Sequence, residues 1–164
     1  MRSARESSKQ PRPRYAAVGV AFMPPPKPGP RLVDTSIWIR ADRKGHEAIK
    51  DRLTGLVVAG SAWICWPIHT ELLIGVKTPE HWAALDERLG SLEHAPVTDE
   101  TWHQAAQLGH DLARKGQTVP LADLLIAVAA IELGLPLWTA DSDFKRIATV
   151  VPLHLDWFGT ESQT

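Results

Sequence analysis

The sequence predicts an α/β fold with three layers, in which helices cover both faces of a central parallel sheet of about four to five strands. From Arg31 onward, short apolar runs alternate with helix-length periodic segments, which is the pattern of a parallel sheet covered by helices. The 164 residues, with 44% hydrophobic content, are enough for one ordinary domain with a real core. We therefore expect a single domain of this class.

Short apolar runs predict five strands. Most are bounded by a polar residue, a glycine or a proline, which are typical of strand ends and turns. Asp34 directly follows the first run and Pro67 closes the second. The expected strands lie at 32–33, 62–66, 92–97, 135–138 and 150–155.

Helices are predicted between these runs by apolar residues at helical spacing. Pro79 suits the first turn of one helix, Gly90 ends it, Thr98 with Thr101 or Asp99 caps the next, and Gly134 ends the last long one. The expected helices contain Ile37 and Ile39, and then cover about 48–56, 68–76, 79–90, 98–116, 121–133 and 144–147.

The chain divides by composition into three parts. Residues 1–30 form a Pro/Arg-rich extension holding seven of the thirteen prolines, and such a segment cannot bury enough apolar surface to offset its ordering entropy. We expect it to be disordered, with the folded domain at 31–157 and a C-terminal tail at 158–164. Met23 is a candidate native start, which the intact mass of the native protein would test.

Charge is also divided unevenly. Residues 1–31 contain seven Lys or Arg and one Glu, a balance of +6, so the remaining residues have a balance of −7. Two explanations of this negative charge are open: an ordinary acidic surface, or a concentrated carboxylate site that needs cations. The longest apolar stretch is too short for a membrane span, and the single cysteine, Cys65, has no partner for a disulfide. We expect a cytoplasmic protein without a membrane segment.

Four acidic residues stand where a carboxylate cluster needs them. Asp34 and Asp141 follow the first and fourth expected strands, and ligands of open α/β sheets gather at the carboxyl ends of strands. Glu71 and Asp123 lie on expected helices and are embedded in apolar residues. Together they could converge in one crevice, where carboxylates and water are suitable ligands for Mg²⁺ or Mn²⁺.

Each acid also has an ordinary structural interpretation. Asp34 could be a plain helix N-cap, and Asp141 or Asp143 could cap the short helix after it. Glu71 could be a first-turn glutamate that favours the helix dipole. Asp123 lies on a helix that is apolar nearly all round, where a carboxylate needs a partner, a capping role or a metal.

The order of these motifs resembles the PIN-domain family, and within it the VapC-type toxins of bacterial toxin–antitoxin pairs. The resemblance covers about residues 31–157. The matching motifs are Val33-Asp34-Thr35-Ser36, Glu71-Leu72 with Gly75, Leu121-Ala122-Asp123 with Ile126-Ala127, and Thr139-Ala140-Asp141-Ser142-Asp143-Phe144.

This resemblance implies a PIN-like fold and a divalent-metal-dependent endoribonuclease that hydrolyses RNA phosphodiesters. Asp34, Glu71, Asp123 and Asp141 would be the catalytic acids, and Asp34, Asp123 and Asp141 the metal ligands for Mg²⁺ or Mn²⁺. Auxiliary roles would fall to Thr139, Asp143 and Ser36. The resemblance also implies a cognate antitoxin and a homodimer, for which the helices of Trp82 and Trp102 offer apolar surface.

Other residues suggest how RNA would be held. Trp38 could stack a base, and the basic residues beside it, Arg40, Arg43 and Lys44, are candidate RNA contacts. Trp63, Trp66 and Trp138 fall in expected strands and are predicted to pack in the core. The seven histidines show no zinc motif, so we expect them to be solvated or packed. An alternative to the enzyme is a PIN-like assembly module whose acids no longer bind metal.

Overall fold

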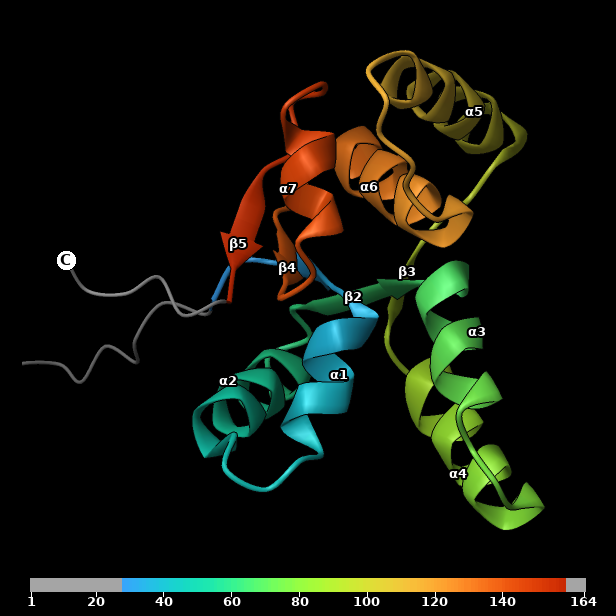
Figure 1. Cartoon of the computed structure of the whole chain (residues 1–164). Helices are drawn as coiled ribbons and strands as arrows, with labels where there is room; N and C mark the ends of the chain where they lie inside the picture. The colour runs from blue at the N-terminus through green and yellow to red at the C-terminus, as the bar shows by residue number, and fades with distance from the viewer. Residues whose placement is uncertain (1–27, 159–164) are drawn as a thin grey trace, which may run out of the picture.

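A computed structural model describes residues 28–158, and the expected extension and tail therefore lie almost wholly outside the described residues. The described part contains five strands and seven helices (Figure 1). The strands are β1 (Arg31–Val33), β2 (Ala62–Cys65), β3 (Glu93–Ala95), β4 (Leu137–Thr139) and β5 (Leu155–Trp157). The helices are α1 (Thr35–Ala41), α2 (Glu47–Val58), α3 (Trp66–Ile74), α4 (Pro79–Gly90), α5 (Asp99–Arg114), α6 (Leu121–Leu133) and α7 (Asp143–Ala148).

The strands form one parallel sheet in the order β3-β2-β1-β4-β5. Because β1 lies in the middle, its carboxyl end is flanked by those of β2 and β4. This order creates a topological switch point beside β1, because the chain adds β2 and β3 on one side of β1 and then β4 and β5 on the other. The predicted parallel α/β/α architecture is confirmed.

Two apolar cores, one on each face of the sheet, explain the three layers. Val33 and Trp138 face α1 and α2, which contribute Ile37, Ile49 and Leu53 to the smaller core. The larger core joins the opposite face to α3, α5, α6 and α7. In Figure 1, α1 and α2 accordingly lie on one side of the sheet and α5, α6 and α7 on the other.

Helix α6 is the central element of the larger core, and seven consecutive residues from Leu124 to Ala130 are buried. Helix α5 packs closely against it because Gly109 has no side chain, and a Cβ there would lie 2.9 Å from Leu124 Cδ1. Gly134 ends α6 in the left-handed conformation, with φ of 63°, as its position predicts. This packing fixes the start of α6, where Asp123 lies.

Local capping signals were predicted well. Thr98 and Thr101 form a reciprocal capping box at the start of α5. Pro79 lies in the first turn of α4 as predicted, and Thr78, which the sequence analysis did not name, accepts a hydrogen bond from the His81 amide there. Helix α5 ends at Arg114, two residues before Gly116, whose φ is 72°. These features depend on residues within four positions of each other, so the sequence pattern is sufficient to identify them.

Several strand bounds need correction. The third and fourth strands cover Glu93–Ala95 and Leu137–Thr139, against the predicted 92–97 and 135–138. The second strand ends at Cys65, because Pro67 is accommodated in the first turn of α3 and the helix includes Trp66. Trp66 is 59% exposed, so its predicted core position is wrong, whereas Trp138 is fully buried. The fifth strand covers Leu155–Trp157, and residues 150–154 form an irregular segment after α7.

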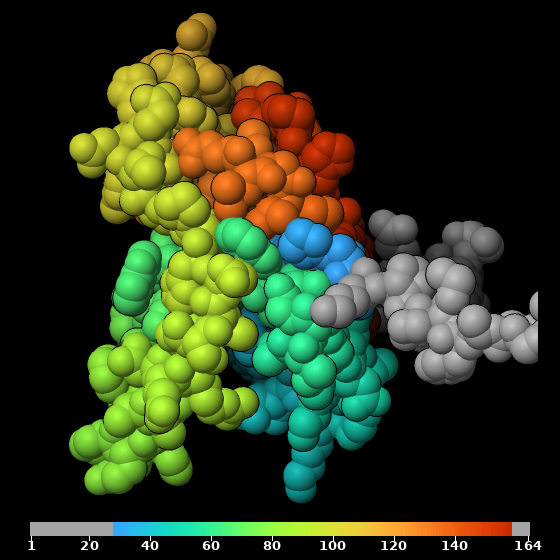
Figure 2. Space-filling view, turned by 180° about the vertical axis from the view of Figure 1, so that it is seen from behind, coloured from blue at the N-terminus to red at the C-terminus, as the bar shows by residue number. Residues whose placement is uncertain are grey.

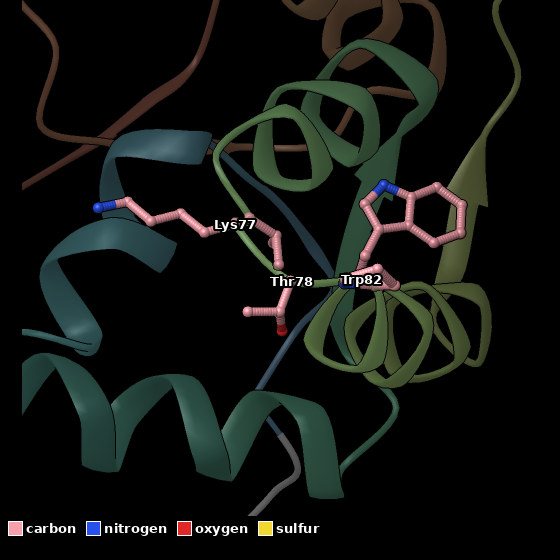
Figure 3. A pocket seen from close by; sticks show the side chains of 5 residues that line it. Lys77, Thr78 and Trp82 are labelled. Carbon is pink, nitrogen blue, oxygen red and sulfur yellow. The ribbon is translucent and has the colours of Figure 1, made fainter.

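An open surface hollow of about 360 Å³ lies at the turn between α3 and α4. Lys77 and Trp82 extend to opposite sides of this turn in Figure 3. Seen from behind, the α4 residues project from the body of the molecule (Figure 2). The hollow is lined by Val76, Lys77, Thr78, Pro79 and Trp82, and none of the four predicted acids lines it. No helix of residues 28–158 is long and apolar enough to cross a membrane.

Candidate active site

The four predicted acids lie near the carboxyl ends of the central strands. Asp34 directly follows β1, and Asp141 is two residues beyond β4. Glu71 is the sixth residue of α3, which begins where β2 ends, and Asp123 is the third residue of α6. Because β1 pairs in parallel with both β2 and β4, these strand ends share one edge of the sheet.

Asp34 is 3% exposed and is held through one oxygen. Its Oδ2 accepts hydrogen bonds from the Ser36 amide at 3.2 Å, from the Ser36 hydroxyl and from Thr139 Oγ1 at 2.9 Å. Burial raises the pKa of Asp34 above its usual value, and these hydrogen bonds partly offset that rise. Asp34 is thus the N-cap of α1 through Oδ2, while Oδ1 has no hydrogen-bond partner in the described part of the chain.

Ser36 and Thr139 connect the turn after β1 to the turn after β4. Ser36 Oγ accepts a hydrogen bond from the Ala140 amide at 3.0 Å, and Thr139 Oγ1 accepts one from the Asp141 amide at 3.0 Å. Since both hydroxyls also donate to Asp34, each of them fixes that carboxylate relative to the β4 turn. Ser36 and Thr139, two of the three residues predicted as auxiliary, thus hold Asp34 and the backbone around Asp141.

Replacing Thr139 with valine is expected to lower the free energy of unfolding by about 1–3 kcal/mol, the usual cost of leaving buried polar partners unsatisfied. The variant removes a donor to Asp34 and the acceptor of the Asp141 amide. Urea denaturation would measure the loss. Thr139→Ser keeps the hydroxyl and should recover most of it, and a Thr139→Val protein as stable as wild type would contradict this role.

Within residues 28–158, Asp123 neither caps its helix nor pairs with a basic residue. The N-cap of α6 is Pro120, without a side-chain cap, and no hydrogen bond or ion pair engages the Asp123 carboxylate within residues 28–158. Burial is the largest cause of its raised pKa, which is about 7. Further causes, each a negative charge near this side chain, are Asp141, Asp34, Glu71 and Asp143.

Glu71 is exposed and not in the first turn of α3, so its interpretation as a dipole-favouring first-turn glutamate is wrong. Its Oε2 accepts a hydrogen bond from Thr35 Oγ1 at 2.6 Å. Sequence analysis missed Thr35, because nothing in the sequence indicates a contact between residues 36 positions apart. Glu71 is therefore joined to the residue next to Asp34.

Asp141 and Asp143 differ in their surroundings. Asp141 Oδ1 accepts a hydrogen bond from the Asp143 amide at 2.9 Å, which stabilises the start of α7 as a cap would. Asp143 forms an ion pair with Arg146, so its charge is already balanced by a neighbour. Of the two, Asp141 is the one whose charge is left without a cationic partner in the described chain.

The donor chemistry of this cluster fits a hard divalent cation. Its side chains offer carboxylate and hydroxyl oxygens, which Mg²⁺ and Mn²⁺ prefer. Burial raises the pKa of the nearby Cys65 thiol to about 12, so it stays protonated and is a poor ligand for soft metals. Across residues 28–158, no three His, Cys, Asp or Glu side chains stand as a set of metal ligands, so joint binding of one ion by these acids would require their side chains to turn toward it.

The predicted RNA contacts lie at the end of α1 and just after it. Arg43 and Lys44 are exposed, and Arg40 is half-buried. Trp38 packs against both cores, and its indole N–H donates to the Val33 carbonyl at 3.1 Å. Because its ring takes part in packing, Trp38 offers a base less surface than the sequence suggested.

A histidine pair that the sequence did not reveal braces the helix of Glu71. His69 on α3 is 1% exposed, lies 2.8 Å from Asp86 on α4 through Nε2, and lies 3.0 Å from His94 of β3 through Nδ1. Trp66 stacks on His69 with a centroid separation of 4.9 Å. These contacts join α3 to α4 and to the edge strand, and they confirm a packing role for His69 and His94.

Comparisons with known proteins agree with this geometry. The family model described as PIN domain matches residues 31–150. Ribonuclease VapC18 of Mycobacterium tuberculosis is 30% identical over 129 residues, covering 76% of this chain and 92% of the relative. Ribonuclease VapC5 of the same organism is 32% identical over 129 residues, covering 73% and 89%.

Solved structures give the same result. In the crystal structure of VapBC2 from Rickettsia felis bound to a promoter DNA fragment, one chain matches with a TM-score of 0.64 and 26% identity, covering 79% of this chain and 98% of that one. In VapBC-5 from Mycobacterium tuberculosis the TM-score is 0.58 with 25% identity, covering 80% and 100%. Since the family model covers most of the chain and the relatives match along nearly their whole length, the chain belongs to the PIN-domain family.

Proposed function

We propose that this protein is a divalent-metal-dependent endoribonuclease and the toxin of a type II toxin–antitoxin pair. The observation that carries the proposal is Asp123, a partly buried carboxylate that has no cation or capping bond within residues 28–158. Its pKa is raised first by burial and then by four other carboxylates. Mutual repulsion of this kind is costly to a fold and is relieved when a cation binds. The ribonuclease names of the curated relatives supply the substrate class.

The acids divide into ligands and a residue that faces the attacking water. In this proposal Mg²⁺ or Mn²⁺ would be held by Asp34, Asp123 and Asp141. When bound, such an ion activates water and balances the charge that develops on the phosphate. Glu71, whose Oε1 has no protein partner in the described residues, would orient the water for in-line attack.

The remaining residues support these steps. Ser36 and Thr139 hold Asp34 so that its Oδ1 stays available. Asp143 would take an auxiliary part at the edge of the cluster. Arg40, Arg43 and Lys44 would contact RNA phosphates, which fix the position of a strand without reading its sequence.

Because water is the attacking group, the RNA 2′-hydroxyl is not needed. We expect cleavage to require Mg²⁺ or Mn²⁺, to stop in excess chelator, and to leave a 5′-phosphate and a 3′-hydroxyl. Mapping the product ends by ligation before and after phosphatase treatment would test this. A primary product with a 2′,3′-cyclic phosphate, or full activity in chelator, would refute the metal-dependent mechanism.

The proposal includes partners and location. VapBC-5 from Mycobacterium tuberculosis, whose structure resembles this chain, is a member of the VapBC family of toxin–antitoxin systems, and we propose an antitoxin protein as the natural inhibitor. Trp82 and Trp102 are 44% and 49% exposed and offer apolar surface for a homodimer. A cytoplasmic location suits the single free thiol of Cys65.

A further inference from the structure

We propose that Thr35 is a positioning residue for Glu71. It holds one oxygen of the Glu71 carboxylate so that the other oxygen faces the attacking water. The contact is the 2.6 Å hydrogen bond from Thr35 Oγ1 to Glu71 Oε2. This inference rests on the endoribonuclease function proposed above. It adds a residue that neither touches the metal ligands' oxygens nor belongs to the predicted set.

The position of Thr35 explains why it can play this part. It is the first residue of α1 and directly follows Asp34, whereas Glu71 lies on α3, a different element. The hydrogen bond thus sets the distance between the helix that carries Glu71 and the turn that carries Asp34. Asp34 is fixed by three hydrogen bonds. Through Thr35, the position of Glu71 is therefore set relative to an acid that is itself held in place.

Glu71 needs such a contact more than the aspartates do. Asp34 and Asp141 are short side chains that each accept a hydrogen bond from the backbone amide two residues ahead, and Asp34 also accepts one from the buried Thr139 hydroxyl of the β4 turn. A glutamate has one more rotatable bond and loses more conformational entropy when it is ordered. Within residues 28–158 no hydrogen bond other than that from Thr35 engages the Glu71 carboxylate.

The contact contributes little to the fold itself. It lies at the surface, where both partners can exchange it for hydrogen bonds to water, so its net effect on stability is small. Its effect is instead on orientation, because a carboxylate that rotates freely spends less time where the attacking water is bound. Loss of the hydroxyl should therefore lower kcat and leave folding intact.

The test is the isosteric variant Thr35→Val, compared with Thr35→Ser, in the RNA cleavage assay. We expect Thr35→Val to lower kcat about 10-fold, with KM changed less than about twofold, and Thr35→Ser to restore most of the rate. In a Glu71→Gln background, Thr35→Val should cause no further loss, because the two residues act as one unit. Thr54→Val, which removes a hydroxyl that bonds only the Lys50 carbonyl on α2, is the matched control and should be unaffected.

A second measurement does not depend on activity. In metal-free protein labelled with ¹³C at the glutamate carboxyl carbons, Glu71→Gln identifies the Glu71 resonance by its loss. That resonance should move in Thr35→Val and stay in place in Thr35→Ser and Thr54→Val.

The outcomes separate the two levels of the proposal. Any of four results would overturn the role of Thr35. Thr35→Val could be as active as an active wild type, or Thr35→Ser could be as impaired as Thr35→Val. The losses of Thr35→Val and Glu71→Gln could be additive, or the Glu71 resonance could stay unmoved in Thr35→Val. A wild type that cleaves no RNA with Mg²⁺ or Mn²⁺ refutes the endoribonuclease instead, and the resonance then decides whether Thr35 holds Glu71.

Discussion

Replacing Asp34 with asparagine is expected to lower the rate of RNA cleavage by about 10²- to 10⁴-fold while the protein stays folded. The asparagine carbonyl can still accept the hydrogen bonds from Ser36 and Thr139, and asparagine is as good an N-cap as aspartate. The substitution therefore removes the negative charge and leaves the local structure in place. The loss of activity would then come from weaker cation binding.

This expectation can be checked by initial rates at several Mg²⁺ concentrations together with a thermal melt. Asp51→Asn, at an exposed position on α2, is the matched control and should cleave like wild type. An Asp34→Asn protein with wild-type activity would rule out the proposed site. A variant that has lost both activity and its cooperative melt would show that Asp34 is needed for folding, and the role in cation binding would then have to rest on Asp123.

Asp123→Asn is expected to have two opposite effects, an activity loss of similar size and a gain in stability at neutral to alkaline pH. The folded protein raises the pKa of Asp123 from 3.8 to about 7, with burial as the main cause and Asp141 as the next. The folded state therefore binds this proton more tightly than the unfolded state. Stability falls as pH rises from about 4 to 7 and remains lower above pH 7, where the carboxylate is charged in both states.

Asparagine removes that charge and its repulsion. Because Asp123 is only partly buried, solvent screening reduces the effect, and we expect a gain on the order of 1–2 kcal/mol at pH 8 in chelator, with little difference at pH 4. Urea denaturation at both pH values would measure it. Mg²⁺ should stabilise wild type and not the variant, since only an ion that binds the folded state shifts unfolding.

If wild type and Asp123→Asn were equally stable at pH 8, the charge of Asp123 would not destabilise the folded protein, and this prediction would be wrong. An Asp51→Asn control that gains as much as Asp123→Asn would show that the gain comes from overall charge, because the domain is acidic as a whole.

The sequence by itself determined the fold class, and it singled out four acids as candidate site residues. Apolar runs alternating with helical periodicity, and caps such as Thr98 and Gly134, act over a few residues, so they can be recognised without the fold. The acids were recognised because strand ends and early helical turns are positions where polar side chains collect in a parallel sheet. Asp34 and Asp141 are in such positions, at the ends of neighbouring strands.

Tertiary structure decided which interpretation of each acid applies. Asp34 caps α1 through Oδ2, and within residues 28–158 its Oδ1 has no hydrogen-bond partner and stays available for the proposed site. No pattern of residues distinguishes the two oxygens. In the described part of the chain, Asp123 has no hydrogen-bond or ion-pair partner, and Glu71 accepts a hydrogen bond from Thr35. Both facts depend on how α6 and α3 pack beside β1. The exposure of Trp66 and the pairing of His69 with His94 were likewise beyond the sequence. The physical reason is that these contacts join residues far apart in the chain, whose distance is set only when the helices dock on the sheet.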